Sequence, residues 1–358
     1  MKIRECLTYD DVLLEPAYSE VKSRSDIDLS VNLNTNDNFC LNFKHPIIPA
    51  NMKTITGKEL AIKNIMCGGL SILHRFMPIE EQLDIVKDII DNYGNKNIGV
   101  SVGVKEEDEK NIYKFYKLGI RIICIDIAHG DSKLCVQMIE YIRKFYPEIF
   151  IIAGNVATGS GAKRLWGSGA NAVKIGVGGG ALCTTRIETG NGIPQLSALM
   201  DAAKARKQIL EDRADSIRNS EVIDQSIQQN LYIISDGGIK NAGDLVKSLC
   251  FADMAMAGNV FAGCVETPGQ IISMNGHTYK DYVGSSTHKT NHIEGVVAIV
   301  PTKGKYTEIF TKLLEGVKSG CSYQGVDNLI DLKDNPQFVK ITNAGLRESH
   351  SHDVIIKG

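Results

Sequence analysis

The clearest candidate for covalent chemistry is a cysteine at the tip of a glycine-rich loop. Cys183 lies in the segment VKIGVGGGALCTTRIETGNGIPQ, residues 173–195, after four glycines and before Thr184, Thr185 and Arg186. Glycines allow backbone N–H groups to approach an anion, or backbone carbonyl groups to surround a cation. A thiol there could be activated by the neighbouring cation and by backbone dipoles, and could attack an electrophilic carbon. We therefore predict that Cys183 is a nucleophile; the structural alternative is a small core residue.

Two glycine turns later in the chain offer a place for a phosphate group. Asp236, Gly237 and Gly238 follow one apolar run, and Gly258 and Asn259 follow the next. The loops after the last two strands are the usual phosphate site of an eight-stranded α/β barrel. The carboxylate would repel a phosphate, so a sugar hydroxyl is its more natural partner. The structural alternative for Asp236 is that its side chain caps the next helix.

Two other polar residues, Asp126 and Asn155, also follow apolar runs and could hydrogen-bond a ribose or an amide. The sequence has no G-x-G-x-x-G after its first strand and no G-x-x-x-x-G-K-[ST] motif. A nicotinamide cofactor would therefore be held without a Rossmann fold.

Eight short apolar runs must position these residues. The runs begin at residues 45, 68, 97, 120, 149, 172, 231 and 254. Between them lie segments such as IEEQLDIVKDIIDNYG, whose apolar residues recur at the three- and four-residue spacing of a helix. This alternation predicts one (β/α)8 TIM barrel over residues 1–358, with the candidate residues at its C-terminal mouth. An open doubly wound sheet is the structural alternative.

The composition is that of an ordinary globular protein. The 358 residues include 40 basic and 42 acidic side chains, so the formal net charge is -2, and neither nucleic acid nor a membrane surface is an expected partner. Nine scattered cysteines without a C-x-x-C pair, and no long apolar stretch, indicate a cytoplasmic protein with reduced thiols. Two segments interrupt the barrel pattern: we expect a surface helical insertion at 205–229 and a mobile flap at 282–304.

Several motifs together resemble the family of IMP dehydrogenases and GMP reductases, and the resemblance runs nearly end to end. The motifs are LTYDDVLLEPAYSEV, HRFMPIEEQ, IDIAHGDS, AGNVAT, GGGALCTTRIETGNGIPQ, SDGGIK and GLRESHSHDV. The resemblance implies that a cysteine attacks C2 of a purine nucleoside monophosphate and that hydride passes between C2 and a nicotinamide, NAD or NADP. In the dehydrogenases water resolves the thioimidate, whereas in the reductases it forms by loss of ammonia.

The resemblance also implies roles for particular residues. Cys183 matches the nucleophile and Thr185 the hydroxyl that assists it. The substrate-binding positions are Met52, Asp236, Gly237, Gly238, Gly258, Asn259, Tyr282 and Glu294, and the cofactor side is represented by Asp126 and Asn155. A potassium site matches the carbonyl groups of Gly178, Gly180 and Cys183, completed from a neighbouring subunit by Glu348, Ser349 and His350. This arrangement implies a homotetramer.

Departures from the family pattern bear on the reaction. Ala181 and Asn259 stand where the family usually or often has serine, and each lost hydroxyl–phosphate hydrogen bond should cost about 1.5 to 3 kcal/mol. The segment MPIEEQLDIVKDIIDNYG runs straight into the third strand, so the paired regulatory CBS domains are missing. The flap lacks the Arg-Tyr pair that activates water in dehydrogenases. His288 and His292 could replace it, or could be solvated loop residues.

The departures leave three functions open. The segments EGVVAIVPTKG and ESHSHDV resemble dehydrogenases, whereas the flap and the segments PANMKT and SVGVKEED resemble reductases. We favour IMP dehydrogenase, with GMP reductase as the alternative. A third hypothesis is a barrel that binds purine nucleotides without turning them over.

Overall fold

Eight parallel strands form the centre of the molecule. A computed structural model of the chain describes residues 3–34, 40–218, 231–284, 296–351 and 354. Each apolar run contains one strand, and the strands are β4 (Ile47–Pro49), β5 (Ser71–Leu73), β6 (Ile98–Val102), β7 (Ile122–Asp126), β8 (Phe150–Val156), β9 (Ala172–Ile175), β10 (Tyr232–Asp236) and β11 (Met254–Ala257). Hydrogen bonds connect them in the order β4-β11-β10-β9-β8-β7-β6-β5, and β4 and β5 contact each other. The prediction of a (β/α)8 barrel is confirmed, and the open-sheet alternative is wrong.

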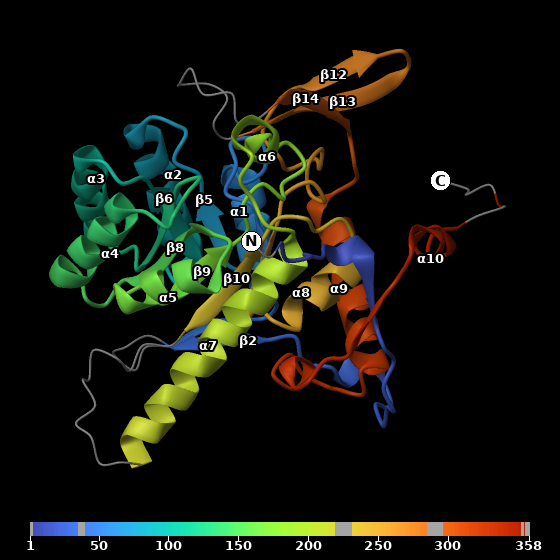
Figure 1. Ribbon diagram of the computed structural model, residues 1–358. Helices are drawn as coiled ribbons and strands as arrows, with labels where there is room; N and C mark the ends of the chain where they lie inside the picture. The colour runs from blue at the N-terminus through green and yellow to red at the C-terminus, as the bar shows by residue number, and fades with distance from the viewer. Residues whose placement is uncertain (1–2, 35–39, 219–230, 285–295, 352–353, 355–358) are drawn as a thin grey trace.

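Helices surround this sheet (Figure 1). They are α1 (Lys58–Met66), α2 (Ile79–Tyr93), α3 (Glu106–Lys117), α4 (Lys133–Phe145), α5 (Gly159–Gly167), α6 (Thr185–Thr189), α7 (Gln195–Arg218), α8 (Ala242–Leu249), α9 (Tyr306–Tyr323) and α10 (Asn343–Glu348). Side chains of Ser132, Thr158 and Asn241 accept hydrogen bonds from N–H groups in the first turns of α4, α5 and α8, which fixes where those helices begin. Helix α2 follows β5 after a short connection, so no further domain is inserted there.

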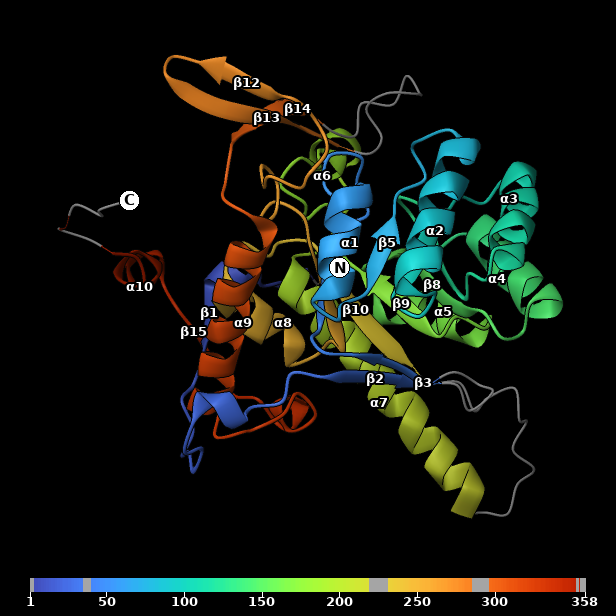
Figure 2. The same cartoon turned by 180° about the vertical axis from the view of Figure 1, so that it is seen from behind.

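Four antiparallel pairings extend the barrel. Strands β2 (Val31–Asn34) and β3 (Cys40–Phe43) pair with each other, and β1 (Val12–Leu14) pairs with β15 (Phe338–Lys340). Strands β12 (Ile271–Met274), β13 (His277–Val283) and β14 (Val297–Pro301) form a three-stranded sheet, which we call the flap sheet. Figures 1 and 2 show the flap sheet projecting beyond the end of the barrel that carries α6, whereas α7 extends away from the opposite end.

The two segments expected outside the barrel pattern are partly described. Helix α7 begins at Gln195, ten residues before the expected insertion, and continues to Arg218, while residues 219–230 are outside the described part. The flap prediction covers β14 and the end of β13, but His288, His292 and Glu294 lie outside the described residues. In the described part of the chain, no helix combines the length and the apolar character that crossing a membrane requires.

Candidate active site

Cys183 lies on the loop that connects β9 to α6, at the C-terminal end of the barrel. Its Sγ donates to the Thr185 hydroxyl oxygen at 3.2 Å, and its N–H donates to the carbonyl oxygen of Gly180 at 3.1 Å. The cysteine is half-buried, so a small electrophile can reach it. The structure therefore brings together the predicted nucleophile and the threonine that the family resemblance assigns to assist it.

Arg186 supports this loop from inside. Its guanidinium donates to the carbonyl oxygen of Val177 at 3.2 Å and to that of Ile193 at 2.6 Å, and so joins the two ends of the loop. The side chain passes beside Gly178, where φ is +78° and an added Cβ would lie 2.4 Å from Cγ of the arginine. The sequence suggested this cation as an activator of the thiol. Its described hydrogen bonds instead end on main-chain carbonyls of the loop.

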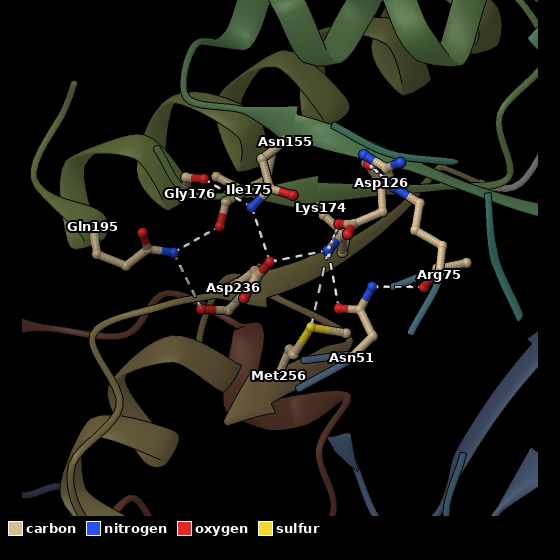
Figure 3. Close-up of polar contacts among 12 residues, drawn as sticks. Asn51, Arg75, Asp126, Asn155, Lys174, Ile175, Gly176, Gln195, Asp236 and Met256 are labelled. Carbon is tan, nitrogen blue, oxygen red and sulfur yellow. Dashed lines mark hydrogen bonds and ion pairs between the residues drawn. The ribbon is translucent and has the colours of Figure 1, made fainter. Parts of the chain in front are cut away.

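A fully buried lysine occupies the centre of the barrel mouth. Lys174 Nζ lies 2.7 Å from Asp126 Oδ1 and 3.1 Å from Asp236 Oδ2, as Figure 3 shows. Burial opposes its charge, but the two carboxylates together raise the pKa of Lys174 well above its usual value. Burial likewise tends to raise the pKa of Asp126, but the lysine lowers it overall. The lysine and this carboxylate are therefore charged near neutral pH.

Three amide and guanidinium side chains complete this network. Asn155 Nδ2 donates to Asp236 Oδ2 and to the carbonyl oxygen of Gly176, both at 2.8 Å. Asn51 Nδ2 donates to the Ser101 hydroxyl at 2.7 Å, and its Oδ1 faces Lys174. Arg75 Nε donates to the carbonyl oxygen of Asp126 at 3.1 Å. The predicted ribose ligand and the predicted cofactor-side residues thus belong to one hydrogen-bonded cluster.

Lys174 and Arg75 were not predicted from the sequence as parts of this cluster. A clue was available for the lysine, because it is the one charged residue in the run AVKIGV. A charge within a buried strand needs a partner of opposite charge, and the acidic ends of neighbouring strands could have supplied it. The acids that lie close enough to pair with Lys174 depend on the distances between strands, which the spacing of residues along the chain does not reveal.

The predicted substrate residues meet on the other side of the mouth. An added Cβ at Gly258 would lie 3.4 Å from the Tyr282 hydroxyl and 3.6 Å from Met52 Sδ. A Cβ at Gly237 would lie 3.4 Å from the carbonyl carbon of Gly179, so the two glycine loops touch. An added Cβ at either glycine would be in ordinary van der Waals contact with these neighbours.

Tyr282 is buried at the edge of this space. Burial, and then the charge of Asp236, raise the pKa of Tyr282 to about 12, so its hydroxyl keeps its proton near neutral pH. A protonated phenol can donate a hydrogen bond to an anion. Asn259 follows Gly258, and its carbonyl oxygen accepts from Lys303 Nζ at 2.7 Å.

One predicted set is not brought together within the chain. Glu348, Ser349 and His350 are exposed at the end of α10, which stands apart from α6 and the cysteine loop in both views (Figures 1 and 2). Gly178, Gly180 and Cys183 stay together on the loop after β9. Within the described ranges there is no group of three His, Cys, Asp or Glu side chains arranged to hold a metal ion.

Comparisons with known proteins show what the chain is similar to. A family model described as IMP dehydrogenase / GMP reductase domain matches residues 6–352. The inosine-5'-monophosphate dehydrogenase of Aquifex aeolicus is 30% identical over 99% of this chain and 97% of its own length. The GMP reductase of Bacillus licheniformis is 36% identical over 94% of this chain and 96% of its own length. The two alignments span 499 and 345 positions, so the dehydrogenase contains long stretches that this chain lacks.

Proposed function

The chain belongs to the IMP dehydrogenase / GMP reductase family, and we propose that it oxidises or reduces C2 of a purine nucleoside monophosphate through Cys183. The observation that carries the proposal is the 3.2 Å contact between Cys183 Sγ and Thr185 Oγ1 on a loop that touches Gly237. Because that glycine follows Asp236, a nucleotide whose ribose bonds the carboxylate would extend toward the thiol.

Each residue has a task in this proposal. Asp236 accepts hydrogen bonds from ribose hydroxyls, Gly237 and Gly258 leave space for the phosphate, and Tyr282 donates to it. Met52 lies under the base. The Cys183 sulfur, as thiolate, forms a bond to C2, and Thr185 is placed to accept the thiol proton or to return one.

The cofactor side fits a ligand that carries hydroxyl groups. Asp126 keeps 19% of its side chain exposed above Lys174, which is 2% exposed, so one carboxylate can bond the lysine below and a ribose above. Asp126 and Asn155 would hold NAD or NADP. When bound, the nicotinamide accepts or supplies the hydride. The lysine keeps Asp126 ionised and therefore a hydrogen-bond acceptor.

The loop carbonyls also suit a potassium ion. Main-chain oxygens are the ligands that potassium sites use, and Gly180 O accepts one hydrogen bond and keeps a second lone pair. Gly178, Gly180 and Cys183 would hold the ion, which would order the loop when bound. Three carbonyl groups do not complete a coordination shell, so residues from another subunit are needed.

We propose that the chain catalyses the IMP dehydrogenase reaction and that it forms a homotetramer. The exposed position of Glu348, Ser349 and His350, away from their own cysteine loop, supports this assignment, because these residues can then reach a neighbour's potassium site. In this reaction the Cys183–C2 bond forms, hydride leaves C2, and water displaces the sulfur to give XMP and the free thiol.

GMP reductase is the second candidate, and the segment between β13 and β14 favours it. Residues 284–296 contain no Arg-Tyr pair to activate the displacing water. In the reductase reaction the sulfur displaces ammonia from C2 of GMP, hydride arrives at C2, and the thiolate leaves. Because this reaction needs no hydrolytic water, the missing Arg-Tyr pair would not lower its rate.

Absorbance at 340 nm distinguishes the candidates. Purified protein is supplied with IMP and NAD, or with GMP and NADPH, each with potassium chloride. Formation of NADH supports the dehydrogenase, and consumption of NADPH supports the reductase. Cys183→Ala should abolish either rate, whereas Cys40→Ala, a half-buried cysteine on β3, should not. Nucleotide binding without turnover in both assays would point to the binding-only barrel and contradict the proposal.

A further inference from the structure

Two lysines of the flap sheet region hold the turn that follows β11. Lys303 Nζ donates to the carbonyl oxygens of Asn259 at 2.7 Å and Val260 at 2.9 Å. Lys280 Nζ, on β13, donates to the carbonyl oxygens of Cys264, Val265 and Thr267 at 3.1, 2.9 and 2.7 Å. Five carbonyl groups in the stretch 259–267 therefore end on two ammonium groups.

The first of these contacts fixes the orientation of a peptide group at the proposed phosphate site. A peptide is planar, and its N–H points opposite to its carbonyl, so holding the carbonyl also aims the next N–H. The carbonyl oxygen of Ala257 accepts from Ala50 N, which aims the N–H of Gly258. The carbonyl oxygen of Gly258 accepts from Phe261 N, which aims the N–H of Asn259.

The third peptide in this series depends on a side chain. The carbonyl oxygen of Asn259 accepts from Lys303 Nζ, and this contact aims the N–H of Val260. Among the described residues, the N–H groups of Asn259 and Val260 have no hydrogen-bond acceptor, so both are available to a ligand. Lys303 thus orients the third peptide group, whereas main-chain hydrogen bonds orient the two preceding peptide groups.

The lysine is itself placed by a close main-chain approach. Lys303 N donates to the carbonyl oxygen of Gly263 at 2.7 Å, so the same residue holds both ends of the turn. Gly263 has φ of +84°, and an added Cβ would lie 2.3 Å from the carbonyl oxygen of Pro301. Only glycine allows the turn and the end of β14 to come this close. Lys280 is buried, and each of its three donors has a carbonyl partner.

We infer that Lys303, supported by Lys280, is a positioning residue for the phosphate of the nucleotide. It acts through the main chain at 258–260 and makes the segment that follows β14 part of the phosphate site. The inference rests on the proposed function, because it assumes that the phosphate binds at this turn.

The test compares Lys303→Met with Lys305→Met, a matched change at an exposed lysine two residues away. IMP binding is measured by titration calorimetry without cofactor, and KM and kcat are measured with the nucleotide that the native enzyme turns over. For Lys303→Met we expect about tenfold weaker binding and higher KM, as for one misplaced charge-assisted hydrogen bond, with kcat nearly unchanged. Lys303→Arg, which keeps a charged donor, should restore part of the affinity.

A second readout separates a local effect from general distortion. The rate of Cys183 alkylation by iodoacetamide, without nucleotide, should be the same in the native protein and in Lys303→Met. Equal IMP affinity in the two proteins would overturn the inference while leaving the proposed function intact, as would a parallel loss of kcat and thiol reactivity. If the native protein binds neither IMP nor GMP, the proposed function itself fails. Should Lys303→Met not fold, Lys303→Gln, which keeps one donor group, takes its place.

Discussion

At the scale of single residues, Lys174 determines whether two carboxylates can share the barrel mouth. Its ammonium group lies within 3.1 Å of an oxygen of both Asp126 and Asp236. Without this charge the two acids would face each other in a poorly solvated space, where each would be costly to ionise. The lysine therefore stabilises the fold and keeps Asp126 in its anionic form.

Replacing this lysine should destabilise the protein strongly. We expect Lys174→Met to lower the free energy of unfolding by about 3 to 5 kcal/mol, because it leaves buried charges without a partner. Urea unfolding at neutral pH measures the change. The double variant Lys174→Met/Asp126→Asn should recover part of the loss, since it also removes one of the stranded carboxylates. A single variant as stable as the native protein would contradict the described network.

Single candidate residues were easier to name from the sequence than their partners. Cys183 and Asp236 stand out because their types, beside glycines, suit one task each, whereas Thr185 was named through the family resemblance. Arg186 was harder, since its position beside the cysteine suggested an electrostatic role, whereas its guanidinium binds Val177 and Ile193 carbonyls. A long side chain can reach partners in several directions, and only the folded loop selects among them.

At the scale of elements, the barrel strands bury two histidines. His45 precedes β4 and His74 follows β5. Burial lowers the pKa of His45 to about 4, and burial with the nearby charge of Lys53 lowers that of His74 to about 4. Both rings are therefore neutral in the folded protein at neutral pH, while in the unfolded chain they take up protons near their ordinary value of 6.5.

This difference predicts a loss of stability in mild acid. The folded-state pKa values are depressed, so stability is fully present above pH 6.5 and declines as the pH falls toward 4. Each histidine should contribute a slope of up to about 1.4 kcal/mol per pH unit. Urea unfolding between pH 7 and pH 4 measures the slope, and His45→Asn should make it shallower. His277→Asn, at an exposed position, is the control; identical slopes for all three proteins would refute the assignment.

The elements themselves follow from the sequence to different degrees. All eight barrel strands lie in the apolar runs, because a strand buried on both faces is apolar throughout. The strands of the flap sheet were not predicted, although β14 has the apolar sequence VAIVP, because polar residues surround these strands and both β12 and β14 are largely exposed. Helix α7 begins earlier than the charged stretch suggested, since its first turns are packed on the barrel and most of its charged residues lie in its later part.

At the scale of the whole molecule, α10 stands apart from α6 (Figure 1). Glu348, Ser349 and His350, at and after the end of α10, are exposed, which suits the proposed potassium site between subunits. The family resemblance supplied this idea, and no spacing along one chain could have, because the proposed contact lies between molecules.

The proposed shared site predicts that the potassium dependence of the activity resides partly in residues 348–350. We expect Glu348→Gln to raise the potassium concentration needed for half-maximal activity by about tenfold, the effect of losing one charged group near a cation. Glu315→Gln, an exposed acid on α9, is the matched control. Activity is titrated with potassium chloride against a constant total of potassium and sodium. Unchanged potassium dependence in Glu348→Gln would remove this residue from the site.

The pairing of β1 with β15 has a consequence for synthesis of the protein. Val12 lies opposite Lys340, and Leu14 lies opposite Phe338, so a strand made among the first residues waits for a partner about 330 residues later. At ribosomal speeds of about 5 to 20 residues per second, that wait lasts roughly 16 to 65 seconds. During this interval the backbone N–H and C=O groups at the edge of β1 can pair with another chain. The nearest such chains would be other copies being synthesised on the same messenger RNA.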